Sequence, residues 1–170
     1  MKSGPDPKTP DRAPSDECRE GPKAAFRPFL ACQHERTKGC GSVSGGGSGV
    51  ATTIDVDLTN DPGGPTPAGA GAGYKPLVTT VSVGASIRFT NSDGFRHTAS
   101  SIAGSTFPSA YPFTAAAANQ SGTTLSGGFS SGSIAPGDSS QTLLADKAGT
   151  YMFGCFFHYG TPMRAVIVVQ

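Results

Sequence analysis

The sequence predicts an all-β protein: a β-sandwich of about seven or eight short strands, preceded by a mostly irregular N-terminal extension. Two observations support this fold class. Short stretches of alternating or continuous apolar residues recur along most of the chain, and Gly- and Pro-rich turns separate them. The chain also contains 24 Gly and no Trp, and with its many Ser and Thr this composition suits a loop-rich β domain better than helices.

Length and charge indicate one domain with an appendage. The chain has 170 residues and a formal net charge of +1, so there is no electrostatic case for binding nucleic acid or an anionic membrane. Residues 1–40 carry eight Lys/Arg and six Asp/Glu, more than half of all charged residues, and the following stretch GSVSGGGSG is a typical flexible linker. We therefore expect an extension and linker at 1–49 and a compact domain at 50–170.

Three cysteines lie in this extension, at Cys18, Cys32 and Cys40. Such cysteines suit an oxidising compartment, where two of them could form a disulfide in any of three pairings. A metal site that also includes His34 is an alternative, although the spacing lacks the close Cys pair of structural zinc sites. The first residues have no apolar signal-peptide core, which fits either a cytosolic protein or a mature form from which the signal peptide is missing. Because of these cysteines we expect the second, a mature periplasmic or other extracytoplasmic form.

The first half of the domain contains three expected strands. Three aliphatic residues alternate with two aspartates at 50–58, so one face of this strand is expected to be buried. The stretch PGGPTPAGAGAG at 62–73 is too poor in side chains for a strand and is interpreted as a loop. Residues 76–91 contain two strands separated at Val83-Gly84-Ala85, and the sequence NSDG at 91–94 has strong turn chemistry.

The second half combines short strands with one long connection. Residues 103–128 show no clear period, and we expect a long excursion over the surface that could hold one helical turn. No run of about 18 apolar residues occurs, so no membrane span is predicted. Further strands are expected at 98–102, 129–134, 141–145, 151–157 and 163–169.

The last twenty residues contain the chemistry on which a functional hypothesis depends. Cys155, His158 and Met163 are spaced as C-x2-H-x4-M in a short loop between two apolar runs. One Cys, two His and a distant Met form the ligand set of a blue-copper electron-transfer site, and His97 is the candidate for the missing His. Taken alone, a Cys or Met in an apolar stretch is usually a buried hydrophobe, so the prediction depends on all four residues together.

With these residues the chain resembles the cupredoxin family, most closely its plastocyanin and pseudoazurin branch, over the whole predicted domain. The matching motifs are Asn91–His97 (NSDGFRH) and Cys155–Met163 (CFFHYGTPM). The resemblance implies a Greek-key β-sandwich that binds one copper ion, Cu2+ or Cu+. It also implies that His97, Cys155 and His158 are equatorial ligands and that Met163 is the axial ligand.

The resemblance implies roles for neighbouring residues as well. Thr98 would lie near the Cys155 sulfur, and Asn91 would bridge the ligand loops. His158 would reach the surface through an apolar patch from which electrons leave. The other members of this expected electron-transfer surface are Phe157, Tyr159 and Pro162. The extension and the two long loops exceed what a minimal cupredoxin needs, and they could cover the copper end, add a partner surface or supply another ligand.

The functional hypothesis is a soluble, monomeric electron carrier that is not an enzyme. It would pass single electrons between redox partner proteins of the cytochrome or oxidase/reductase type. An alternative is a periplasmic copper-binding or copper-tolerance protein that handles copper with the same site. A third possibility is one domain of a multicopper enzyme, but such sites need further His ligands, and the chain has three His in all.

Overall fold

The computed structural model describes Met1 and residues 50–170. The expected extension and linker, and the pairing of Cys18, Cys32 and Cys40, fall almost entirely outside the described residues and stay predictions. The described part of the chain contains no helix with the length and apolar character needed to span a membrane.

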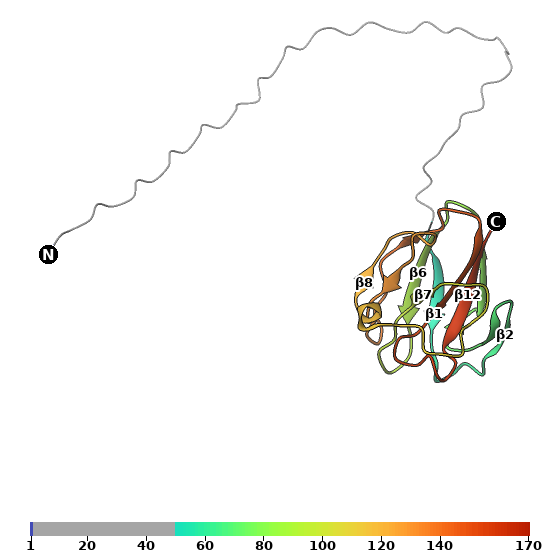
Figure 1. The fold of residues 1–170 in the computed structure, drawn as a ribbon, viewed down its shortest axis with the longest axis horizontal. Helices are drawn as coiled ribbons and strands as arrows, with labels where there is room; N and C mark the ends of the chain where they lie inside the picture. Colours follow the sequence, from blue (N-terminus) through green and yellow to red (C-terminus); the bar gives the residue numbers. More distant parts are fainter. Residues whose placement is uncertain (2–49) are drawn as a thin grey trace, which may run out of the picture. The chain divides into compact units, whose positions relative to one another are not determined.

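The domain consists of two main β-sheets and a small hairpin (Figure 1). The first sheet has the order β10-β6-β1-β4 and consists of β1 (Thr52–Val56), β4 (Tyr74–Lys75), β6 (Ser86–Asn91) and β10 (Leu143–Leu144). The second has the order β5-β12-β11-β7-β9-β8 and consists of β5 (Val78–Val81), β7 (Ser100–Ile102), β8 (Gln120–Ser121), β9 (Ser130–Ser131), β11 (Gly149–Gly154) and β12 (Arg164–Val169). The hairpin joins β2 (Gly64–Thr66) to β3 (Gly69–Gly71).

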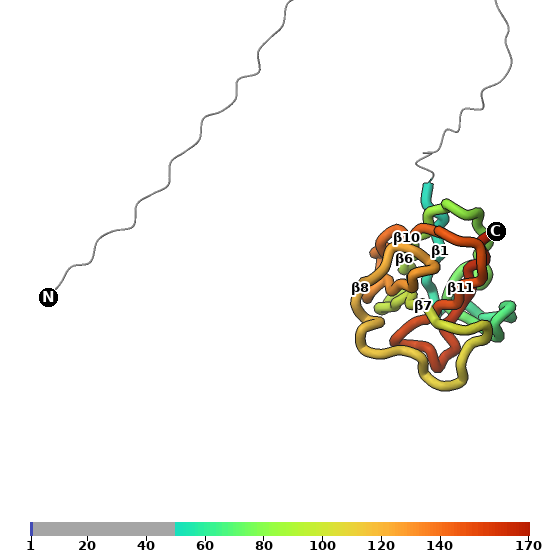
Figure 2. Tube along the Cα trace, turned by 45° about the horizontal axis from the view of Figure 1, so that its top comes forward, coloured from blue at the N-terminus to red at the C-terminus, as the bar shows by residue number. Residues whose placement is uncertain are grey.

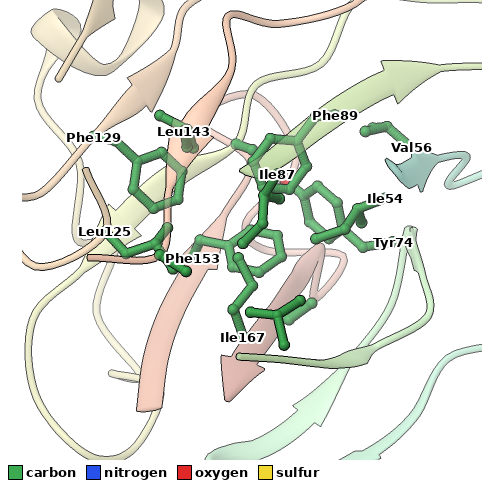
Figure 3. Close-up of a cluster of buried hydrophobic side chains, with 14 of the residues drawn as sticks. Ile54, Val56, Tyr74, Ile87, Phe89, Leu125, Phe129, Leu143, Phe153 and Ile167 are labelled. Atoms are coloured by element: carbon green, nitrogen blue, oxygen red, sulfur yellow. The ribbon is translucent and has the colours of Figure 1, made fainter. Parts of the chain in front are cut away.

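The hydrophobic core lies between the two main sheets, as the alternating pattern predicts. Alternate residues of β1 and β6 are buried and meet apolar side chains of β11 and β12 in one cluster (Figure 3). At its centre, the ring centroid of Phe153 lies 4.8 Å from that of Tyr74 and 5.1 Å from that of Phe89, both edge to face. Burying each such aromatic ring stabilises the fold by about 1.5–3 kcal/mol. The predicted all-β sandwich is therefore confirmed.

The excursion after β7 packs against the outside of the larger sheet. Figure 2 shows this part of the chain, in yellow, running along the outside of the domain. Phe107 and Phe113 are half-buried against a second apolar cluster that includes Met152 and Val166. The expected helical turn is present as a 3-10 helix, η1 (Ala115–Ala118).

The prediction of a loop at 62–73 is wrong, because β2 and β3 form an antiparallel hairpin there. Backbone pairing needs no large side chains, and the Thr66 hydroxyl closes the hairpin by donating a 2.7 Å hydrogen bond to the Gly69 carbonyl. The twelve strands in the described residues exceed the expected seven or eight. Several have only two or three residues, too few to produce a detectable apolar period.

Strand register brings two loops to the same end of the domain. β11 pairs with β12 and with β7, so Gly154 lies opposite both Arg164 and Ser100. The loop 155–163 therefore starts beside the end of the 92–99 connection, which crosses from β6 in one sheet to β7 in the other. In Figure 1 both connections lie at the end of the domain opposite the C-terminus.

Candidate metal centre

The loop between β11 and β12 is held by its own backbone. The Cys155 N–H donates to the Met163 carbonyl at 2.9 Å, which continues the ladder one step beyond the strands. The His158 carbonyl accepts hydrogen bonds from the N–H groups of Thr161 at 3.0 Å and Met163 at 3.3 Å. Cys155, His158 and Met163 are thereby fixed relative to one another within a single turn.

His97 is held in place from the other loop. Its backbone pairs with Ile134 in both directions, at 3.2 and 2.8 Å, and its side chain is fully buried. The Asn91 side chain donates to the carbonyls of Phe95 at 2.8 Å and Ile134 at 3.0 Å. Asn91 was expected to bridge the ligand loops. These contacts tie the His97 turn to Ile134, while Thr98 forms hydrogen bonds with the other ligand loop.

Three candidate ligand atoms converge from the two loops. The Cys155 Sγ lies 3.5 Å from His158 Nδ1 and 3.7 Å from His97 Nδ1, and the two Nδ1 atoms lie 3.2 Å apart. Protein metal ions bind imidazole nitrogen at about 2.0–2.1 Å and thiolate sulfur at about 2.3 Å. One ion between these atoms can therefore reach all three. The donor set of one thiolate and two imidazoles is suited to copper or zinc, so the residues present fit the copper ion implied by the sequence.

Met163 is also fully buried, and it packs against the backbone of Gly73. A Cβ at Gly73 would lie 2.6 Å from Met163 Cγ, and Gly73 has a φ of +79°. Both facts require glycine at this position, because a side chain would meet Met163 and would be strained in the left-handed region. The structure thus places Met163 in the turn that carries Cys155 and His158, while its role as axial ligand stays a prediction.

The Cys155 sulfur lies in a buried environment with hydrogen-bond donors. The Thr98 N–H points at Sγ from 3.4 Å, and the Thr98 hydroxyl accepts a 2.8 Å hydrogen bond from the Phe156 N–H. Burial raises the pKa of the Cys155 thiol, and N–H groups, that of Thr98 foremost, partly oppose this effect. A bound cation stabilises the thiolate directly, so this buried Cys suits metal ligation better than exposed reactivity.

Both imidazoles are biased toward the neutral form that binds metals. Burial lowers the pKa of His97, and the nearby Asp93 carboxylate only partly opposes this effect. Burial and the neighbouring His97 lower the pKa of His158. Burial would raise the pKa of Asp93, but hydrogen bonds from Thr59, Gly94 and His97 hold it well below its usual range. The site thus combines two neutral rings with one ionised carboxylate.

Asp93 and Tyr74 are two buried neighbours of the site that the sequence analysis did not single out. Asp93 has an obvious turn role in NSDG, so its position four residues before His97 was only a weak signal. The Tyr74 hydroxyl donates to the Thr98 carbonyl at 2.5 Å from within the core. No short motif marks Tyr74, because this contact depends on the packing of distant strands.

The expected electron-transfer surface is only partly exposed. His158 and Pro162 are half-buried, and Phe157 is 45% exposed. Tyr159 was expected here but is only 5% exposed. It turns toward the excursion after β7, where its hydroxyl donates a 2.7 Å hydrogen bond to the Pro108 carbonyl. The long excursion, whose path the sequence did not specify, accounts for this difference.

Phe95 contributes to this surface in place of Tyr159. It is 42% exposed, and its ring centroid lies 4.8 Å from that of His97 and 5.2 Å from that of His158. Its position inside the Asn91–His97 motif was the available signal. We define the exposed rim of the site as Phe95, Phe157 and the half-buried His158 and Pro162.

No model of a known protein family matches the sequence, and no curated protein is detectably similar to it. Among solved structures, the chain is similar to a purple cupredoxin from Nitrosopumilus maritimus, with 21% identity, a TM-score of 0.44 and coverage of 70% of this chain and 99% of that one. It is also similar to the oxidised plastocyanin from Dryopteris crassirhizoma (16% identity, TM-score 0.44, coverage 70% and 100%). A third is the Cu(I) form of an amicyanin variant, with 16% identity, a TM-score of 0.44 and coverage of 71% of this chain and 82% of that one. By its two sequence motifs and by the convergence of His97, Cys155 and His158, this domain resembles the cupredoxins.

Proposed function

We propose that this protein is a single-electron carrier with one mononuclear type 1 copper site formed by His97, Cys155, His158 and Met163. The observation that carries the proposal is the convergence of the Cys155 sulfur and two imidazole nitrogens within 3.7 Å of one another. Bound copper would supply the reversible one-electron change between Cu2+ and Cu+. The protein's own residues hold, shield and connect that centre.

Burial and rigidity support this role. His97 and Cys155 are fully buried, so water has little access to the site from their side. The ligand loops are held by backbone hydrogen bonds, and the strands that flank them, β6, β7, β11 and β12, belong to both main sheets. Such a frame resists rearrangement when the charge of a bound ion changes, which favours fast electron transfer. The ligands could therefore keep nearly the same positions in both oxidation states.

The rim suggests how electrons reach a partner. His158 is the ligand nearest solvent, and Phe95 and Phe157 make its surroundings apolar. A small apolar rim suits the brief, weak encounters of electron-transfer proteins. The partners would be one-electron redox proteins of the cytochrome or oxidase/reductase type, outside the cytoplasm. The protein would act as a monomer and would catalyse no bond chemistry.

The deciding experiment is the addition of Cu2+ to the full chain with visible and EPR spectroscopy. An intense visible charge-transfer band is expected, because the Cys155 thiolate would donate to the ion. Cys155→Ser should abolish the band. The matched control replaces Cys18, Cys32 and Cys40 together by Ser and should retain it. A colourless wild-type complex, with copper bound only by nitrogen and oxygen, would contradict the proposal.

Copper handling is the second candidate, and one contact favours it. The half-exposed Tyr111, in the excursion after β7, donates a hydrogen bond to the Phe156 carbonyl next to Cys155. A simple shuttle does not need this additional cover over the Cys loop. Very slow electron self-exchange, together with retention of Cu+ against a competing chelator, would favour this second function. Fast self-exchange would favour the carrier.

A further inference from the structure

His97 uses its two ring nitrogens in opposite directions. Its Nδ1 faces the Cys155 sulfur and His158, as described above. Its Nε2 lies 3.1 Å from Asp93 Oδ2, and the side chains of His97 and Asp93 are 0% and 3% exposed. A buried imidazole thus lies between the candidate metal position and a buried carboxylate.

The surroundings of Asp93 determine which atom carries the proton. Its Oδ2 accepts hydrogen bonds from the N–H groups of Leu58 at 2.9 Å and Thr59 at 3.1 Å. Its Oδ1 accepts from the Thr59 hydroxyl and the Gly94 N–H, both at 2.7 Å. Backbone N–H groups can only donate, so the carboxylate is held as an acceptor. His97 Nε2 must then be the donor, and in the neutral imidazole this leaves a lone pair on Nδ1.

We infer that Asp93 is a positioning residue that fixes the Nε2–H tautomer of His97 and lowers the reduction potential of the site. The inference deepens the proposed function and rests on it for the potential, but not for the tautomer. A carboxylate on the far nitrogen makes a ligating imidazole more basic. A negative charge in a dry environment also stabilises the higher charge of Cu2+ more than that of Cu+.

The proposed redox cycle moves one electron at a time. One electron arrives from a one-electron reductant protein and later leaves to a one-electron oxidant protein. No bond forms or breaks, and the proton stays on His97 Nε2 throughout. Asp93 therefore affects the position of the redox equilibrium without taking part in proton transfer.

Asp93 also ties the turn after β6 to Leu58 and Thr59, so its replacement is expected to lower stability whatever its effect on copper. The test therefore needs a measurement that stability alone does not change. Asp57 provides the matched control, because it is another buried carboxylate, at the end of β1, whose own partners are Lys75 and Asn60. Asp57→Asn removes the same charge nearby without touching a candidate ligand.

The first experiment measures midpoint potentials of the copper-loaded full chain, alongside the visible band. Asp93→Asn should shift the ratio of Cu+ to Cu2+ affinity toward Cu+ by at least about tenfold, which is about 59 mV for one electron. Asp57→Asn should shift it by less than about threefold, since Asp57 is paired with Lys75 and makes no hydrogen bond to a candidate ligand. Equal shifts in the two variants, or no shift in Asp93→Asn, would overturn the inference. A wild-type protein without the visible band would instead count against the proposed function.

The second experiment needs no copper, and its first measurement needs no variant. Long-range 15N NMR of the metal-free full chain should show the His97 proton on Nε2, and zinc binding should leave it there. A proton on Nδ1 would overturn the inference even if Asp93→Asn fails to fold. If the variant folds, its zinc affinity should fall by about 10–100-fold. An unchanged zinc affinity would contradict the role of Asp93.

Discussion

The backbone N–H of Thr98 donates a hydrogen bond of 3.4 Å to the Cys155 sulfur, although 57 positions separate the two residues. This contact joins the connection after β6 to the loop after β11. The Thr98 side chain strengthens the junction, because its hydroxyl accepts the Phe156 N–H at 2.8 Å. Thr98 is therefore the residue through which the two candidate ligand loops are held together.

The first prediction concerns this junction. Thr98→Val should lower the free energy of unfolding of the metal-free protein by about 1–3 kcal/mol, because the Phe156 N–H loses its partner in a partly buried place. Urea unfolding followed by circular dichroism measures the change. Thr98→Ser is the control, since it keeps the hydroxyl and should cost less than half as much. An unchanged free energy of unfolding in Thr98→Val would contradict this role of the hydroxyl group.

The second prediction tests Met163 through Gly73. Gly73→Ala should shift the visible band of the copper-loaded protein, because the new Cβ would lie 2.6 Å from Met163 Cγ and displace it. Gly84→Ala is the matched control: Gly84 has a φ of +89° and nothing within 4 Å of its added Cβ. Each variant should lose about 1–2 kcal/mol of stability from the left-handed backbone, and only Gly73→Ala should lose more. Identical spectra for both variants would argue against Met163 as a ligand.

The third prediction tests the exposed rim as the exit for electrons. Phe157→Glu should slow electron self-exchange between copies by about tenfold or more, because two like charges would meet where the copies touch, and 1.4 kcal/mol is tenfold. NMR line broadening in mixtures of oxidised and reduced protein measures the rate. Val83→Glu is the control. Val83 is 53% exposed and bonds through its N–H to the Gln170 carbonyl, at the opposite end of the domain. A similar loss of rate in both variants would mean that electrons do not leave through the rim.

The fourth prediction concerns pH and the ion pair between Lys75 Nζ and Asp57 Oδ2, which are 2.8 Å apart. The hydrogen bond from Lys75 lowers the pKa of Asp57. The stability that ionised Asp57 contributes is therefore fully present above the usual pKa of 3.8, and it is lost as the pH falls through the lower pKa of the folded state. The same bond raises the pKa of Lys75. The stability that protonated Lys75 contributes is present below the usual pKa of 10.5, and it is lost as the pH rises through the higher pKa of the folded state. The stability difference between wild type and Asp57→Asn should therefore be constant from about pH 5 to pH 9 and shrink outside that window.

Urea unfolding of the metal-free protein at a series of pH values measures this window. Asp55→Asn is the control, because it removes a charge from β1, two residues before Asp57, and leaves the ion pair intact. Protonation of Asp57 should break the ion pair in the wild type, which the Asn variant lacks at every pH. A stability difference between the two proteins that grows below pH 4 would therefore contradict the stabilising role of the ion pair.

Several strands and the candidate ligands were accessible from local sequence patterns. The alternation of apolar and polar residues predicted the first strand and the two strands that precede Asn91. Such a pattern depends only on which side of a single segment is buried. The spacing of Cys155, His158 and Met163 was equally informative, since one short loop brings all three together. The hairpin formed by β2 and β3 was missed because its small residues carry no such pattern.

The sequence by itself determined the residue types of the candidate centre, the β character of the domain and the turn that precedes His97. Only the tertiary structure decided that His97 meets the Cys155 loop, that Asp93 lies behind His97, that Tyr159 turns inward and that Phe95 takes its place at the rim. The physical reason is that local patterns record which side of a segment is buried. Contacts across 57 positions depend instead on strand register and on the path of a long connection, which are settled only when the two sheets pack together.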